Sequence, residues 1–240
     1  CNLSRQNASN QIAMQQQEEL ELIRRIVNGE TDLYAILARR YGRVVYTLVS
    51  RIVGCAEDAE ELAVIYEPYV RETAITFEYV PPTPAEFAER MRKTMEFYPY
   101  LVAELDGRLV GYAYAGTFKG RPAYDWAVET SIYVAQGHAG EGIGRALHDA
   151  LERALAAQGI LNMYACIAVP DGEDDETLTR NSQHFHEHMG YRLVGEFYQC
   201  GFKGGRWYNM VWMEKMLGEH RTDQPPVTPF PETSVTCVER

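Results

Sequence analysis

The 240-residue sequence contains no long apolar run, no regular cysteine spacing and no recognisable secretory signal. No stretch approaches the roughly 18 consecutive apolar residues that a membrane-spanning helix requires, so we expect no membrane partner. The five cysteines include no Cys-x-x-Cys pair, which is typical of a reduced compartment rather than of a disulfide framework. These absences together predict a cytoplasmic protein.

Positive charge is also scarce. The chain has 23 Lys and Arg against 34 Asp and Glu, and its formal net charge of −11 argues against nucleic-acid binding by the chain as a whole. Hydrophobic residues make up 46% of the sequence and charged residues 24%, which is sufficient for the packed core of an ordinary enzyme. At this length we expect one domain with appendages.

The composition changes three times along the chain. Residues 1–19 are polar and lack apolar periodicity, which predicts disorder. Residues 20–53 form a locally basic block with a helical pattern, and this block can include the first strand of the next domain. Residues 54–217 have the mixed strand and helix patterns of a folded domain. Residues 218–240 are rich in Pro and Thr, which is typical of a flexible tail.

The pattern within the central region predicts an α/β arrangement. The dipeptide Asp106-Gly107 lies between two apolar runs and is the strongest short signal for a β-hairpin. The expected helices cover residues 56–69, 85–97, 145–158 and 182–189. The expected strands cover residues 48–53, 101–105, 109–115, 128–134, 163–169, 192–202 and 208–214.

A glycine-dense turn follows the apolar run Ile132-Tyr-Val134 and leads into a helical pattern with leucines at four-residue spacing. Three glycines, Gly140, Gly142 and Gly144, let the backbone approach a ligand, and the first N–H groups of a helix favour an anion. A Walker loop is excluded because no Lys-Ser or Lys-Thr follows the last glycine, and the spacing does not fit a dinucleotide fingerprint. A pyrophosphate cradle and an ordinary helix cap both remain open at this point.

Segments spread over about 150 residues decide between them. They are Ile65-Tyr-Glu-Pro-Tyr-Val, Thr76-Phe-Glu, Tyr98-Pro-Tyr-Leu-Val-Ala-Glu, Gly111-Tyr-Ala-Tyr-Ala-Gly, Phe118-Lys-Gly-Arg, Ala123-Tyr-Asp-Trp-Ala-Val-Glu, Phe185-His-Glu-His-Met-Gly-Tyr and Cys200-Gly-Phe-Lys. In this order they resemble the phosphinothricin acetyltransferase branch of the GCN5-related N-acetyltransferases. The resemblance implies a mixed, mostly antiparallel central sheet flanked by helices, and acetyl-CoA as the co-substrate, with no metal.

The resemblance also implies which residues hold acetyl-CoA. The backbone of the glycine loop and of the preceding strand is expected to contact it, together with one serine on the last helix. These residues are Tyr133, Val134, Gly140, Gly142, Ile143, Gly144 and Ser182. Two positions depart from the family pattern, because Ala139 stands where Gln or Arg is usual and Thr179 stands where Asn is usual.

Glu129 matches the catalytic carboxylate of the branch, and we expect it to remove a proton from the attacking amine, for which a pKa raised by burial is suited. The alternative is a strand carboxylate in a salt bridge. His186 takes the place of the acid that protonates the departing thiolate, or it forms a hydrogen bond to the substrate. His184 and His188 share a helical face but lack a third ligand, so we predict no metal site.

The acceptor that the resemblance implies is a small amino acid-like amine, of the phosphinothricin or methionine sulfoximine type. Lys119 and Arg121 match a basic pair that would hold its anionic group, and Phe77 would line the pocket. The alternatives are solvated loop cations and a core aromatic residue. The acidic segment Asp171–Thr177 is longer than usual in the family and places the herbicide itself in doubt. A homodimer is a further expectation by analogy.

Residues 20–63 resemble the start of region 2 of an extracytoplasmic-function sigma factor, without the helix that would read promoter DNA. Two readings remain for this block: a helical appendage on the catalytic domain, or a partner-binding element. The second reading supports an alternative function, in which a regulatory protein senses acetyl-CoA without catalysis. We favour the enzyme, because the Glu129 position and the glycine loop are intact.

Overall fold

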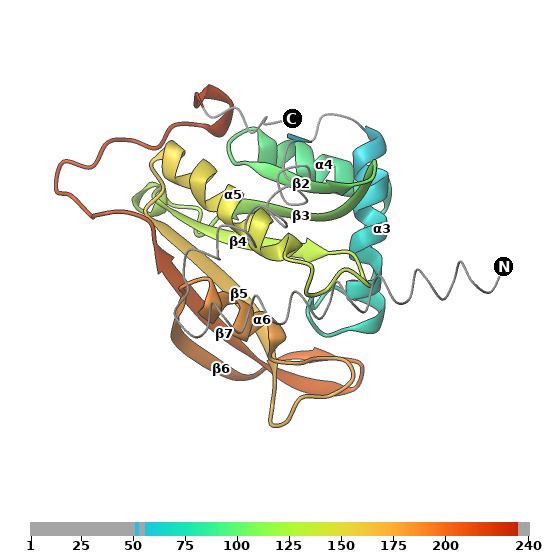
Figure 1. The fold of residues 1–240 in the computed structure, drawn as a ribbon. Coiled ribbons are helices and arrows are strands. Elements are labelled where there is room, and N and C mark those ends of the chain that lie inside the picture. The colour runs from blue at the N-terminus through green and yellow to red at the C-terminus, as the bar shows by residue number, and fades with distance from the viewer. Residues whose placement is uncertain (1–50, 53–55, 235–240) are drawn as a thin grey trace, which may run out of the picture. The chain divides into compact units, whose positions relative to one another are not determined.

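The computed structural model describes residues 51–52 and 56–234, and these belong to one compact unit, Thr47–Arg240 (Figure 1). The predictions made for residues 1–19, for residues 20–50 and for residues 235–240 lie outside the described residues. Helix α3, Ala56–Glu72, packs on the sheet described below, so residues 56–63 are part of the first helix of the domain.

A seven-stranded sheet forms the centre of the domain, in the order β1-β2-β3-β4-β5-β7-β6. The strands are β1 Arg51–Ile52, β2 Tyr100–Leu105, β3 Arg108–Thr117, β4 Ala127–Val134, β5 Asn162–Pro170, β6 Arg192–Lys203 and β7 Arg206–Met216. All neighbours are antiparallel except β4 and β5, which are parallel. The mixed, mostly antiparallel sheet predicted from the sequence is confirmed.

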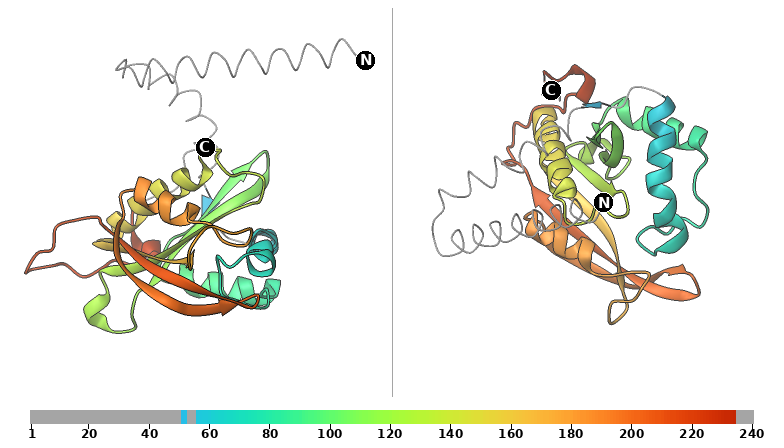
Figure 2. Two further views of the ribbon diagram at one scale, coloured as in Figure 1. Left: turned by 90° about the horizontal axis from the view of Figure 1, so that it is seen from below. Right: turned by 45° about the vertical axis from the view of Figure 1, so that its right-hand side comes forward.

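Helices cover both faces of the sheet, as the two views in Figure 2 show. Helices α3 and α4, the latter at Pro84–Met95, lie on one face, and α5, at Ile143–Gln158, lies on the other. A short helix α6, Asn181–His188, packs beside β5 on the α5 side. The described residues also form two 3-10 turns, η2 at Pro122–Tyr124 and η3 at Phe230–Glu232.

The alternation of side chains along the strands divides the core in two. Tyr100 and Val102 on β2 pack against α3 and α4, whereas Leu101 and Ala103 pack in the cluster that contains α5. All four are buried, because successive side chains of a strand point to opposite faces and both faces of β2 are covered. This explains why the strand reads as a continuous apolar run.

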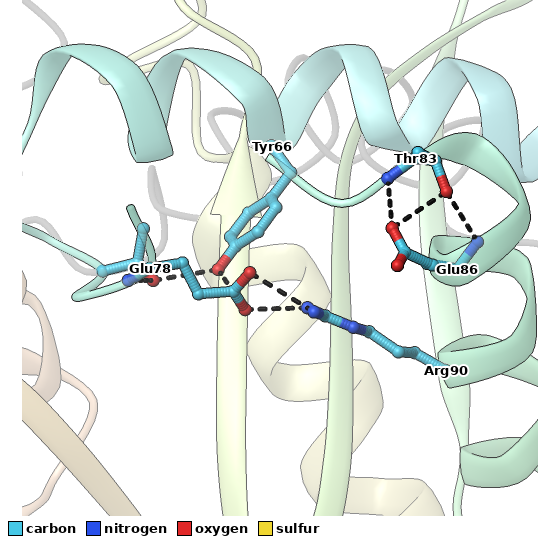
Figure 3. A network of polar contacts seen from close by, with 6 residues as sticks. Tyr66, Glu78, Thr83, Glu86 and Arg90 are labelled. Atoms are coloured by element: carbon cyan, nitrogen blue, oxygen red, sulfur yellow. Dashed lines mark hydrogen bonds and ion pairs between the residues drawn. The ribbon is translucent and has the colours of Figure 1, made fainter. Parts of the chain in front are cut away.

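Local signals in the sequence determine the ends of several elements. Thr83 and Glu86 form a reciprocal capping box at the start of α4 (Figure 3). The β2–β3 hairpin turns at Asp106 and Gly107, which both have positive φ values of 51° and 77°, as a two-residue turn of this kind requires. The hairpin predicted from this dipeptide is therefore confirmed.

Residues 218–234 are packed against the domain, contrary to the flexible tail that their composition predicts. The side-chain amide of Gln158 donates to the carbonyls of Phe97 and Thr228, and the backbone N–H of Phe230 also donates to Phe97. The Trp126 indole donates to the carbonyl of Pro225 at 2.7 Å. Phe230 is itself buried. Composition cannot predict this packing, because the residues that bind the segment are distant from it in the chain.

Candidate active site

The parallel pair β4 and β5 separates partway along its length. The two strands pair at three positions, ending with Glu129 opposite Tyr164, and then continue without pairing to Val134 and Pro170. The main-chain groups that face each other beyond Glu129 therefore lack the ladder that satisfies them elsewhere in the sheet. A ligand that carries amide groups can bond to both strands in this opening.

We call this opening the fork cleft and define it by the side chains that line it from β4, β5, α6 and the α3–α4 loop. They are Ile75, Thr130, Ser131, Ile132, Tyr133, Ala165, Cys166, Ile167, Ala168, Ser182 and His186. Three of the residues predicted from the sequence, Tyr133, Ser182 and His186, meet here. Val134 follows Tyr133 on β4, and its carbonyl accepts a hydrogen bond from Tyr69.

The loop from β4 to α5 has a main chain suited to an anion. Gly137, Gly140 and Gly142 all have positive φ, at 90°, 83° and 83°, which side-chain-bearing residues rarely adopt. Gly142 is the N-cap of α5, and no side chain caps the helix there. The first N–H groups of α5, from Ile143 onward, are thus directed at the loop.

Charge in this loop is unusual for an anion site. His138 Nδ1 lies 2.8 Å from a carboxylate oxygen of Glu141, so the loop's one basic side chain faces its acidic one. Ala139 supplies no polar contact. The main chain of the loop must therefore provide most of its attraction for a pyrophosphate.

Gly144, in the first turn of α5, allows close packing against α6, because a Cβ at this position would lie 3.4 Å from Phe185.

Glu129 lies at the last paired position of β4, opposite Gly116 of β3 and Tyr164 of β5. Burial raises the pKa of its carboxyl group, and the nearby ammonium of Lys119 partly opposes this shift. Among the residues that the structure describes, no cation lies within ion-pair distance of Glu129. A half-buried carboxylate with a raised pKa, at the opening of a cleft, fits a proton acceptor better than a structural ion pair.

The side chains of Lys119 and Arg121 have different described surroundings, although the backbone N–H of Arg121 donates to the carbonyl of Lys119 at 2.8 Å. The Lys119 ammonium lies 4.8 Å from the ring centre of Phe118 and 5.6 Å from that of Trp212, within the range of a cation–π contact. Its positive charge also acts on the carboxyl group of Glu129. Arg121 is exposed at the start of the turn η2. No described contact places its side chain beside Glu129 or the fork cleft.

Phe77 lies in the loop between α3 and α4 and packs beside the far end of β5. Its ring centre is 6.3 Å from that of Tyr208, and it contacts the cluster containing Ala168 and Leu178. Gly201 of β6 lies directly under the ring, because a Cβ at this position would be 2.3 Å from Phe77. Phe77 therefore packs against a cluster whose member Ala168 lines the fork cleft, and Gly201 leaves the space that its ring occupies.

A polar network, which sequence reasoning did not identify, holds the same loop in place (Figure 3). Arg90 of α4 donates to both carboxylate oxygens of Glu78, at 2.7 and 3.3 Å, and Tyr66 of α3 also donates to Glu78. The Tyr66 hydroxyl lies 2.9 Å from that of Thr76, whose carbonyl accepts from Lys203 of β6 at 2.6 Å. Most of these contacts join residues ten to twelve positions apart, and Lys203 joins them from a distant strand, so no spacing pattern indicates the network.

His186 is buried on α6, and its Nδ1 lies 2.7 Å from the carbonyl of Ser182. A carbonyl oxygen only accepts, so this contact assigns the proton to Nδ1. Burial lowers the pKa of His186, which keeps the ring neutral. In this state Nε2 is a hydrogen-bond acceptor. This matches the substrate-bonding role predicted for His186 more closely than the acid role.

The two neighbouring histidines on α6 are arranged differently. His188 Nδ1 lies 2.6 Å from the carbonyl of His184, so one ring nitrogen of His188 is used in a contact within the helix.

Cys166 of β5 is a further cleft residue that the sequence did not indicate. Burial and the charge of Glu129 raise the pKa of its thiol to about 12, so the group stays protonated.

Comparison with known proteins agrees with this geometry. Residues 55–212 match the family model for the acetyltransferase (GNAT) domain. The chain is 36% identical over 168 residues to a phosphinothricin N-acetyltransferase of Streptomyces coelicolor, covering 68% of this chain and 94% of that protein. It is 30% identical over 177 residues to an L-methionine sulfoximine/L-methionine sulfone acetyltransferase of Pseudomonas paraeruginosa, covering 72% and 96%.

A solved structure gives the same result. The fold superposes with a TM-score of 0.65 on a phosphinothricin acetyltransferase of Sinorhizobium meliloti in complex with AcCoA, at 34% identity, covering 76% of this chain and 94% of that one. In the part of the chain that the structure describes, no helix is long and apolar enough to cross a membrane. The chain belongs to the GNAT family and is an N-acetyltransferase, related to the phosphinothricin N-acetyltransferases.

Proposed function

We propose that the protein transfers the acetyl group of acetyl-CoA to the amine of a small amino acid-like acceptor, of the phosphinothricin or methionine sulfoximine type. The observation that carries the proposal is the fork between β4 and β5 with Glu129 at its last pair. The names of the relatives support the acceptor class. The neighbour complexed with AcCoA supports the co-substrate.

The chain's residues fit acetyl-CoA at three points. The unpaired main chain of β4 and β5 suits the amide groups of the pantetheine arm. The glycine loop and the first turn of α5 suit the pyrophosphate, through the backbone of Gly140, Gly142, Ile143 and Gly144. Ser182 and His186 line the cleft from α6. When bound, acetyl-CoA supplies an activated thioester.

The acceptor nitrogen loses two protons in the transfer, one before it attacks the thioester and one as the amide forms. Glu129 removes a proton from the ammonium form of the acceptor, directly or through a water molecule. The amine nitrogen forms a bond to the carbonyl carbon, the carbon–sulfur bond breaks, and the departing sulfur takes up the second proton that the nitrogen loses. His186 Nε2 accepts a hydrogen bond in the cleft and helps to orient the bound groups. Lys119, whose positive charge acts on Glu129, is available to an anionic group of the acceptor.

The test is CoA-thiol release from acetyl-CoA across a panel of amino acids that includes phosphinothricin and methionine sulfoximine. We expect turnover with at least one amino acid-like acceptor and an N-acetylated product by mass spectrometry. Binding of acetyl-CoA without acetylation of any acceptor would contradict the proposal, and would favour the alternative of an acetyl-CoA sensor.

The exposed side of β6 supports a homodimer. β6 is an edge strand of the sheet, and several large apolar side chains are exposed along it and at the start of β7. They are Leu193, Val194, Phe197, Tyr198, Phe202 and Trp207. An exposed apolar edge strand is a template for pairing with another chain. We infer that two copies associate through this edge.

Replacing Phe197 with Glu is expected to shift the protein from dimer to monomer, because a carboxylate would be buried in an apolar interface. Analytical ultracentrifugation measures the shift. Val64→Glu serves as the matched control, since Val64 is an exposed apolar residue on α3. An unchanged sedimentation coefficient for the Phe197 variant would place the interface elsewhere.

A further inference from the structure

His148 is a polar residue in the buried face of α5. Its side chain is 0% exposed, and α5 otherwise buries mostly apolar residues around it. Nε2 lies 3.3 Å from the hydroxyl of Tyr191. Nδ1 has no hydrogen-bond partner among the described residues and lies 3.7 Å from a carboxylate oxygen of Glu152. Buried polar groups are normally hydrogen-bonded, and for His148 the hydroxyl of Tyr191 is the partner that the structure describes.

The bond to Tyr191 is the first step of a chain that reaches the fork cleft. The Tyr191 hydroxyl lies 3.4 Å from Thr130 Oγ1, and Thr130 donates in turn to the carbonyl of Tyr164 at 3.2 Å. Thr130 is the first residue of β4 beyond the last pair with β5, which joins Glu129 to Tyr164. Its side chain therefore bonds across the strands where the main-chain ladder stops.

The direction of the chain follows from its last member. The Tyr164 carbonyl only accepts, so the hydroxyl of Thr130 donates to it, and the hydroxyl of Tyr191 then donates to Thr130. His148 Nε2–H donates to Tyr191, which leaves the lone pair of the ring on Nδ1. Burial and the nearby ammonium of Lys215 lower the pKa of His148 to about 3, which agrees with a neutral ring.

Tyr191 also supports the opposite wall of the cleft. Its ring centre is 5.0 Å from that of His186, with the two ring planes at 90°. The same tyrosine thus contacts Thr130 on β4 and His186 on α6, and its hydroxyl is fixed from behind by His148. A single buried imidazole is linked in this way to both walls of the fork cleft.

The carboxylates of Asp149 and Glu152 stand near His148 and could suggest a metal site. However, the Lys215 ammonium lies 2.5 Å from Glu152 Oε2 and already supplies a positive charge there. A second cation would have to displace it. The geometry therefore favours the hydrogen-bonded chain over a metal.

We propose that His148 is a positioning residue for acetyl transfer, which acts through Tyr191 and Thr130 to fix the point where β4 and β5 separate, next to Glu129. This inference rests on the proposed function of the fork cleft. The loop proposed for the pyrophosphate follows Val134, at the end of β4 remote from the Glu129–Tyr164 pair, so its contribution to the affinity for CoA should not depend on His148.

The first experiment replaces His148 with Leu. We expect kcat to fall about fivefold, in proportion to one lost hydrogen bond, while the Kd for CoA from calorimetry stays within about twofold. Leu155→Ala is the matched control, since Leu155 is also fully buried on α5. It should lower the melting temperature with kcat unchanged. A folded His148→Leu variant with the kcat of the wild type would overturn the proposal.

Three further measurements separate positioning from stability. His148→Gln, whose amide nitrogen can replace the Nε2–H donor, should recover most of the lost kcat. In a Tyr191→Phe background, His148→Leu should cause no further loss, because the chain is already broken. NMR of the wild-type imidazoles should show the His148 proton on Nε2. Additive losses, no recovery by Gln, or a proton on Nδ1 would each contradict the proposal. Absence of turnover in the wild type would instead contradict the proposed function.

Discussion

Replacing Glu129 with Gln is expected to lower kcat by about 10²- to 10⁴-fold, the usual contribution of a general base. Gln keeps the shape of the side chain but cannot take a proton from the ammonium group of the acceptor. CoA-thiol release at saturating acetyl-CoA measures the effect. The Kd for CoA should stay close to that of the wild type, because Glu129 lies at the last strand pair and not in the glycine loop.

The control for this variant is Glu104→Gln, a partly buried carboxylate on β2, away from the β4–β5 fork. It should leave kcat unchanged. Retention of more than about a tenth of the wild-type kcat by the Glu129 variant would show that another group, or the solvent, takes the proton.

The pH dependence of the wild type gives an independent test of the same residue. Only the ionised form of Glu129 can accept a proton, and burial raises its pKa above the ordinary value of 4.5. As the pH falls through this raised pKa, kcat/KM should therefore decrease, and the midpoint should lie above 4.5. The Glu129→Gln variant should lack this acidic limb. An acidic limb that persists unchanged in the variant would assign the titration to another group.

The second large effect is expected at Gly201. A Cβ at this position would lie 2.3 Å from the ring of Phe77, so Gly201→Ala must displace Phe77 and the loop that carries it. We expect the KM for the acceptor to rise about tenfold and the free energy of unfolding to fall by about 1–3 kcal/mol, as is typical of overpacking. The KM for acetyl-CoA should change little. Steady-state kinetics with both substrates and urea unfolding measure these effects.

Gly195→Ala is a close control, because Gly195 lies on the same strand β6 and a Cβ there would meet nothing within 4 Å. This variant should resemble the wild type in both assays. Equal effects of the two substitutions would mean that β6 tolerates no side chain for a general reason, unrelated to Phe77. An unchanged acceptor KM in a destabilised Gly201 variant would remove Phe77 from the acceptor site.

Much of the fold was predictable from local patterns. The hairpin at Asp106-Gly107, the strand before the glycine loop and the helix after it follow from turn chemistry and apolar periodicity. The strand boundaries lie close to those expected, and the resemblance to the phosphinothricin acetyltransferase branch identified the family correctly. The roles assigned to Glu129, to His186 and to the cofactor-binding and substrate-binding residues stay predictions.

Other features arise only from contacts between distant segments. Composition predicts a free tail after residue 217, but Gln158 and Trp126 bind it to the domain. The resemblance implied that Lys119 and Arg121 act as a pair, which stays a prediction, and only the structure shows that Lys119 lies over the rings of Phe118 and Trp212. No sequence pattern indicates that position 201 must be glycine so that the ring of Phe77 can pack against the backbone of β6.

By itself, the sequence determined the order of the elements, the glycine loop and the carboxylate on the strand before it, because these depend on short-range backbone preferences and side-chain periodicity. Only the tertiary structure decided where β4 and β5 separate and how burial raises the pKa of Glu129. Each of these depends on groups more remote than a motif can specify. Strand pairing, desolvation and the hydrogen-bond chain from His148 to Tyr164 exist only once the sheet and its helices have packed.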